Sequence, residues 1–98
     1  MEDLEKIIEG GAIIIDVRTT EEYAEGHIKN SLSIPLDKIE KEMAWLIKDS
    51  PLIICCASGA RSARAKEILE ANGFEKVYNG GSWENLGKMK TGGACPVK

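Results

Sequence analysis

The sequence predicts an α/β domain in which a mainly parallel sheet carries helices on both faces. Short apolar runs that are typical of strands alternate along the chain with segments of helical periodicity. Two of these runs, residues 12–17 and 52–55, are continuously apolar and rich in isoleucine, which is the pattern of strands covered on both faces. Strands that alternate with helices favour parallel pairing, because each connecting helix returns the chain to the same end of the sheet.

In the first half of the chain, two short helices each precede a strand. Residues 3–9 carry apolar side chains at helical spacing and stop at two glycines, so they predict a helix. The isoleucine-rich run 12–17 is the first predicted strand. Residues 20–23 predict a short capped helix that a glycine ends, and residues 31–34 predict a second strand that a proline closes.

In the second half, the same alternation continues. Residues 36–47 place apolar side chains on one face and predict a single helix. The strand 52–55 is followed by a tight loop and a helix over residues 61–72, which a glycine ends. Residues 77–78 predict a last strand, and residues 83–89 predict a last helix. Ligands of parallel sheets bind beyond the carboxyl ends of the strands, so the loop after residue 55 is the expected site.

Length and composition predict one small domain over residues 1–98, with a flexible tail at 90–98. The chain is 43% hydrophobic and 30% charged, and its formal net charge is −3 at pH 7. Without a basic block we expect no nucleic-acid partner, and without a long apolar stretch we expect no membrane contact. An acidic N-terminus in place of a basic signal sequence predicts a cytoplasmic protein. Its three cysteines lack the spacing that is typical of a disulfide framework, so we expect them to be reduced thiols.

Cys56 is the strongest candidate for a catalytic residue. It directly follows the apolar run 52–55 and begins a loop of small residues that leads into the helix at 61–72. The backbone N–H groups of such a loop can converge on the sulfur, and the helix adds about half a positive charge at its N-terminus. Both effects favour the thiolate, which is the reactive form of cysteine. We therefore interpret Cys56 as a nucleophile rather than a buried structural cysteine.

Several segments occur in an order that is typical of one family. They are Ile14-Ile15-Asp16-Val17-Arg18, Glu22-Tyr23 with Gly26-His27-Ile28, Ser31-Leu32-Ser33-Ile34-Pro35-Leu36, Cys56-Ala57-Ser58-Gly59-Ala60-Arg61-Ser62, and Asn79-Gly80-Gly81. Each is a weak signal alone, but the ordered set covers most of the chain and resembles the rhodanese (sulfurtransferase) family, especially its small single-domain members. The resemblance implies a three-layer α/β/α fold with a four- to five-stranded, mainly parallel sheet.

The resemblance also implies a reaction. Cys56 would accept a sulfane sulfur as a persulfide and pass it to a nucleophile. The donor would be a small sulfur-containing anion, thiosulfate or a polysulfide, and the acceptor a thiol, cyanide, thioredoxin or a sulfur-carrier protein. It implies a monomer that needs no cofactor and no metal. The persulfide would be bound by the loop, namely Ala57, Ser58, Gly59, Ala60, Arg61 and Ser62, with Gly59 at a positive φ and Ser62 as the helix cap.

One loop position departs from the family pattern. Ala57 stands where many family members carry Arg or Lys, so Arg61 is the only cation of the loop. We therefore expect a pocket that favours a donor less charged than thiosulfate.

Asp16, Arg18 and His27 invite catalytic roles, but we interpret them, together with Glu22, as structural. Asp16, at a strand end, is expected to accept backbone N–H bonds, and Arg18 to pair with Glu22 across the turn. His27 is the only histidine and would be the base of a Cys-His enzyme. In the family, its matching position stabilises a turn, and sulfur transfer needs no base once the thiolate exists.

Two other functions remain open at the level of sequence. Cys55 and Arg61 have the Cys-x5-Arg spacing of cysteine phosphatases, so a phosphatase or an arsenate reductase that uses Cys55 is an alternative. Against it, Cys55 continues the apolar strand and should point away from Cys56. The second alternative is a non-enzymatic carrier that shuttles a persulfide between proteins.

The C-terminal segment Gly92-Gly93-Ala94-Cys95 ends in a thiol after a glycine hinge. One interpretation is an incidental cysteine in a disordered terminus. The other is that Cys95 is a resolving thiol, which attacks the Cys56 persulfide and forms a Cys56–Cys95 disulfide.

Overall fold

Four parallel strands form a single sheet in the computed structural model, which describes residues 4–46 and 50–91. The strand order is β2-β1-β3-β4, and each of the three pairings is parallel. The strands are β1 (Ile13–Asp16), β2 (Leu32–Ser33), β3 (Leu52–Cys56) and β4 (Val77–Ser82). The expected α/β fold with a parallel sheet is therefore confirmed.

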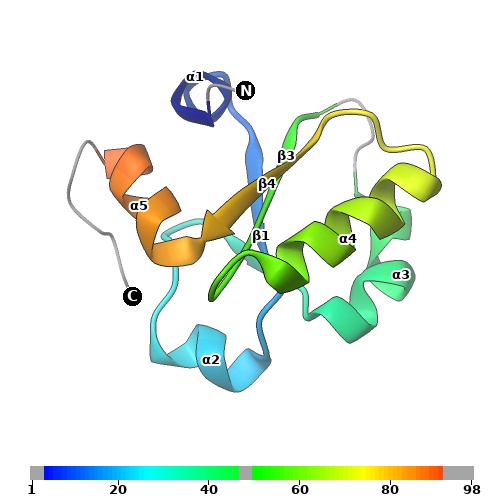
Figure 1. Ribbon diagram of the computed structural model, residues 1–98, viewed down its shortest axis with the longest axis horizontal. Coiled ribbons are helices and arrows are strands. Elements are labelled where there is room, and N and C mark those ends of the chain that lie inside the picture. Colours follow the sequence, from blue (N-terminus) through cyan, green and yellow to red (C-terminus); the bar gives the residue numbers. More distant parts are fainter. Residues whose placement is uncertain (1–3, 47–49, 92–98) are drawn as a thin grey trace.

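Helices cover both faces of this sheet, as Figure 1 shows. On one side lie α1 (Leu4–Glu9) and α5 (Trp83–Thr91), and on the other lie α3 (Ile39–Glu42) and α4 (Ala60–Ala71). The short helix α2 (Thr20–Glu25) lies beyond the end of the sheet toward which β1 runs. A capping box, formed by Thr19 and Glu22, fixes the start of α2.

Each face of the sheet has its own apolar cluster, because successive residues of a strand point to opposite sides. The larger cluster joins Ile15 and Ile54 of the strands to Ile39 of α3 and Leu69 of α4. The smaller one contains Ile14, Ile53 and Leu86, with side chains of α1 packed against it. Cys56 belongs to the larger cluster and Cys55 to the smaller one, so the two neighbouring thiols lie on opposite faces.

The segment predicted as one helix over 36–47 is broken in the structure. It consists of the 3₁₀ helix η1 (Leu36–Lys38), the single α turn α3, and the 3₁₀ helix η2 (Met43–Trp45), and Leu46 is already extended. Apolar side chains at spacings of three and four suit both helix types, so the pattern could not separate them. Residue 47 lies outside the described residues.

Strand β4 is longer than predicted and brings two glycines beside β3. Its pairing with β3 passes a register shift between Ile54 and Cys55 and continues to Ser82, which pairs with Cys56. The first two positions of the tail predicted at 90–98 belong to α5, which extends to Thr91, and residues 92–98 lie outside the described residues. Among residues 4–46 and 50–91, no helix has both the length and the apolar character that a bilayer crossing requires.

Gly80 is the position where the sheet and α5 approach too closely for a side chain. A Cβ there would lie 2.8 Å from Ile53 Cγ2 and 2.9 Å from Leu86 Cδ2. We therefore expect Gly80→Ala to lower the free energy of unfolding by about 1–3 kcal/mol, as overpacking does. In the control Gly10→Ala the nearest atoms would lie 3.5 Å away, and the change should stay within about 0.5 kcal/mol. Urea denaturation measures the change in the free energy of unfolding for both variants, and equal changes would contradict the proposed clash.

Candidate active site

Cys56 is the last residue of β3, and the chain turns over its sulfur before α4 begins. Gly59 makes this turn possible, because it is the N-cap of α4 with φ 105°, in the left-handed region. Its N–H group donates a hydrogen bond of 2.9 Å to Cys56 Sγ, three residues back. The loop therefore aims a backbone donor at the sulfur.

The surroundings of Cys56 favour its thiolate. Burial alone raises the pKa of the thiol, but the backbone N–H groups of Ser62, Gly59 and Ser58, with the Ser62 hydroxyl, outweigh burial and hold the pKa below its ordinary value. The N-terminus of the twelve-residue helix α4 adds partial positive charge at the same place. The expectation of an activated thiol thus has a structural basis.

Ser62 does not cap the helix, which corrects the expectation from sequence, since Gly59 occupies the N-cap position. When Cys56 is the thiolate, the Ser62 hydroxyl instead has three acceptors around it. Its oxygen lies 3.7 Å from Cys56 Sγ, 3.0 Å from the Gly59 carbonyl oxygen and 2.6 Å from Asn79 Oδ1. A hydroxyl has one hydrogen, so these acceptors compete for it.

Asn79, in the middle of β4, is a site residue to which the sequence analysis gave no role. Its amide nitrogen donates to the Gly59 carbonyl oxygen at 3.3 Å, and its Oδ1 accepts from the Gly81 N–H at 2.9 Å. The bond to Gly59 and the contact with Ser62 attach the loop and the start of α4 to β4. The available signal was a polar side chain directly after the predicted strand 77–78 and directly before two glycines.

Asp16 and Arg18 form a buried ion pair behind the site. Arg18 Nη2 lies 2.7 Å from Asp16 Oδ2, and the Arg18 backbone N–H donates to Asp16 Oδ1 at 3.0 Å. The same guanidinium donates to the carbonyl oxygens of Glu22 and Gly26 and lies 4.5 Å from the centre of the Trp83 ring. The predicted pairing of Arg18 with the Glu22 carboxylate is wrong, because Asp16 holds the guanidinium.

The Glu22 carboxylate pairs with Arg61 instead. Arg61 Nη1 donates to Glu22 Oε1 at 2.8 Å and Nη2 donates to Oε2 at 3.2 Å. The hydrogen bonds from Arg61, and to a smaller extent the one from the Thr19 backbone N–H, lower the pKa of Glu22 to about 2. In return, Glu22 raises the pKa of Arg61. The two side chains are each 36% exposed, so this pair lies at the rim of the site.

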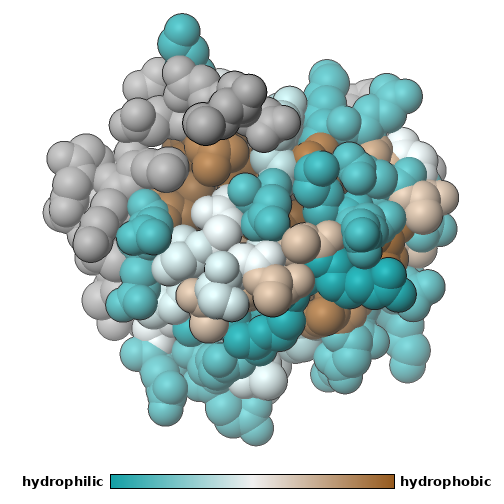
Figure 2. Space-filling view, in the orientation of Figure 1, coloured by the Kyte–Doolittle hydropathy of each residue, from teal (hydrophilic) through white to brown (hydrophobic). Residues whose placement is uncertain are grey.

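His27 stacks on Tyr23 instead of facing the thiol. The two ring centres are 3.7 Å apart, and His27 Nδ1 lies 2.9 Å from the Tyr23 carbonyl oxygen. The exposed side chains of the loop are small, namely Ala57, Ser58 and Ala60. Figure 2 shows weakly polar, pale surface over the start of α4 and the end of β4. The predicted resolving thiol, Cys95, lies outside the described residues.

Cys55 has the opposite environment from Cys56. It is fully buried on the other face of the sheet. This burial raises the pKa of its thiol far above the ordinary value, and the negative charge of Asp16 makes a smaller contribution in the same direction. A neutral thiol on the face of the sheet opposite the loop is poorly placed to act as a nucleophile, so the geometry argues against the alternative based on Cys55.

Comparison with known proteins places this chain in a family. Residues 1–86 match the family model of the rhodanese-like domain, and the chain belongs to that family. It is 32% identical over 81 residues to the thiosulfate sulfurtransferase PspE of Escherichia coli K12, covering 81% of this chain and 78% of PspE. It is 41% identical over 66 residues to the putative sulfur carrier protein YrkF of Bacillus subtilis 168, covering 67% of this chain but only 36% of YrkF.

A solved structure gives the same result for the fold. The structure described as a rhodanese with anions from E. coli superposes with a TM-score of 0.74 at 31% identity. The match covers 90% of this chain and 98% of that one. The predicted three-layer rhodanese fold is therefore confirmed.

The hydrogen bonds to Cys56 predict its titration. We expect the rate of alkylation of Cys56 to rise with pH around a midpoint below the ordinary cysteine pKa of about 8.5, because the loop stabilises the anion. Ser62→Ala removes one weak donor and should raise the midpoint by about half a unit. Ser58→Ala keeps the backbone N–H group and should leave it unchanged. A wild-type midpoint at or above the ordinary value would contradict this description of the loop.

Proposed function

We propose that this protein is a sulfurtransferase that carries a sulfane sulfur on Cys56. The observation that supports this most is the sulfur of Cys56, placed at the start of α4 with a loop N–H group 2.9 Å away. The similarity to PspE supports the same reaction class. Thiosulfate and polysulfide are the candidate donors, and a thiol or cyanide is the candidate acceptor.

In the first step, the Cys56 thiolate attacks the outer sulfur of the donor. With thiosulfate, a bond forms between Cys56 Sγ and the outer sulfur while the bond from that sulfur to the sulfite sulfur breaks. Sulfite leaves with the bonding electron pair, and Cys56 keeps an anionic persulfide. No proton is transferred, which agrees with the position of His27 against Tyr23 rather than against the thiol.

The loop is built to hold the product of this step. The side chains at Ala57, Ser58 and Ala60 are small and exposed, so they would obstruct an outer sulfur on Sγ only a little. The backbone N–H groups that stabilise the thiolate face the same space and can donate to the persulfide. Oriented donors of this kind, where water is excluded, are typically worth about 3–4 kcal/mol each in catalysis.

In the second step, a nucleophilic acceptor attacks the outer sulfur and Cys56 leaves as the thiolate. Cyanide would become thiocyanate, and a thiolate would become a persulfide. The weakly polar surface around the loop is open to either a small thiol or a thiol on another protein, such as thioredoxin or a sulfur-carrier protein (Figure 2). If the acceptor is a protein, the chain acts as a relay in the same chemistry.

Intact mass after incubation with thiosulfate or polysulfide tests this function. We expect wild type to gain the mass of one sulfur atom, and Cys56→Ser to gain none and to lose sulfur transfer. Cys55→Ser should retain the mass gain and most of the activity, because Cys55 faces the opposite side. It should lose about 1–3 kcal/mol of stability, since it buries a hydroxyl among apolar side chains.

The ranking of the two cysteine variants is decisive. A mass gain that persists in Cys56→Ser, or one that Cys55→Ser abolishes while the protein remains folded, would overturn the assignment of Cys56.

A further inference from the structure

The ion pair of Glu22 with Arg61 determines the charge that a donor meets. Arg61 is the only cation of the loop sequence 56–62, and it lies close enough to Cys56 for the two charges to interact. Both of its terminal nitrogens donate to the Glu22 carboxylate, at 2.8 and 3.2 Å. The positive charge at the rim of the site is therefore compensated before any donor arrives.

Glu22 is held in this position from two sides. Its Oε1 also accepts from the Thr19 backbone N–H at 3.0 Å and lies 3.1 Å from Thr19 Oγ1, as part of the capping box of α2. With a pKa of about 2, the carboxylate stays ionised at any neutral pH. A donor would have to compete with a fixed anion for Arg61.

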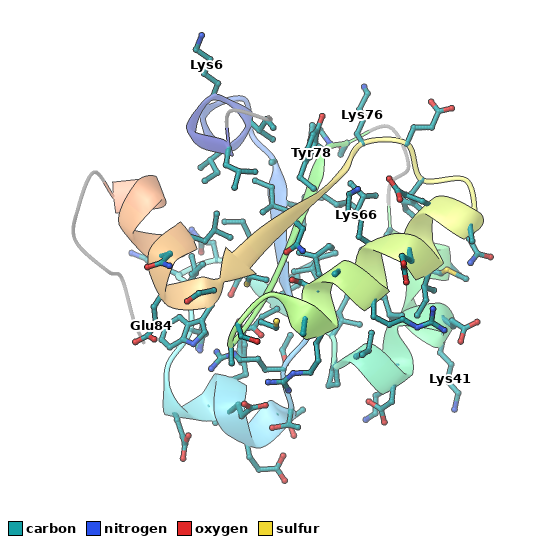
Figure 3. All side chains as sticks on the ribbon, in the orientation of Figure 1. Lys6, Lys41, Lys66, Lys76, Tyr78 and Glu84 are labelled. Atoms are coloured by element: carbon teal, nitrogen blue, oxygen red, sulfur yellow. The ribbon has the colours of Figure 1, made fainter. Side chains whose placement is uncertain are left out.

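Two other guanidinium groups are paired as well. Within the described part of the chain, Arg18 is bound to Asp16, and Arg64, farther along α4, lies 3.4 Å from Glu67. Figure 3 shows Lys6 and Lys76 at the opposite end of the sheet from the loop, and Lys41 pointing away from it. The groups directed at the sulfur of Cys56 are loop N–H groups and the start of α4.

We propose that Glu22 is a specificity-determining residue that makes Cys56 favour a singly charged sulfane-sulfur donor, a persulfide or thiosulfonate anion, over the thiosulfate dianion. This inference rests on the proposed function. The physical reason is that a dianion must approach a thiolate while the nearby guanidinium is occupied by a carboxylate. Loop N–H groups and a helix N-terminus provide only partial positive charges, so a dianion meets no free full counter-charge at Arg61.

Thiosulfate and methanethiosulfonate are a matched pair of donors. Both carry a terminal sulfur that the thiolate attacks, and the leaving groups are sulfite and methanesulfinate, respectively. In each case the sulfur–sulfur bond of the donor breaks, the leaving group takes the electron pair, and Cys56 becomes a persulfide. The donors differ mainly by one unit of charge, so the ratio of their kcat/KM values reports on the electrostatics of the site.

The decisive variant is Glu22→Gln, which keeps a residue able to form the capping box and removes the charge. We expect its kcat/KM for thiosulfate to rise about twofold to fivefold relative to that for methanethiosulfonate at low salt, in the range of an exposed ion pair. The rise should largely disappear in about 1 M salt, where the Debye length is about 3 Å. Glu21→Gln is the control, since this exposed neighbour contacts Thr20 and not Arg61.

A second test removes the cation. In an Arg61→Ala background, Glu22→Gln should no longer change the donor ratio, because no guanidinium remains to be released. If Glu22→Gln changes both donors equally, or if Glu21→Gln has the same effect, the inference is wrong while sulfur transfer by Cys56 stands. If neither donor adds a sulfur to Cys56 in wild type, both the inference and the proposed function fail.

Discussion

The left-handed turn at Gly59 is the constraint on which the site depends. With φ at 105°, the chain reverses directly after β3 and places the Gly59 N–H group against Cys56 Sγ. A side chain at Gly59 would be strained at this φ, and its Cβ would lie 3.3 Å from the Cα of Gly81. The loop can therefore lie close to β4, where Asn79 binds it. One backbone conformation thus positions the thiol, the donors and the start of α4 together.

Two adjacent cysteines in one strand acquire opposite chemistry from this arrangement. Both side chains have 0% exposure, so solvent contact alone does not separate them. Cys56 faces loop N–H groups that lower its pKa, whereas Cys55 faces apolar side chains and the charge of Asp16, which raise its pKa. The reactivity of each cysteine follows from the alternation of side chains between the two faces of the strand and from the residue at which the strand ends. The buried pair of Asp16 with Arg18 keeps the neighbouring end of β1 fixed without contributing a net charge.

The sequence allowed the strands, the parallel pairing and the position of Cys56 to be predicted, because these follow from local patterns. Hydrophobic runs give β1 and β3, and the small residues after Cys56 give the loop. The partner of Glu22 could not be predicted, since Arg61 is 39 positions away and Arg18 was a closer candidate. The contact between Ser62 and Asn79 was missed for the same reason. The extension of β4 to Ser82 depends on a register shift that glycines in a sequence do not reveal.

The central claim is that the loop N–H groups hold the anionic sulfur on Cys56. A crystal structure of the protein after treatment with a sulfane-sulfur donor tests this claim most directly. The account predicts a second sulfur atom bonded to Cys56 Sγ and lying within hydrogen-bond distance of backbone N–H groups between residues 57 and 62. A second sulfur that points into solvent without such contacts, or one that is bonded to a different cysteine, would contradict it.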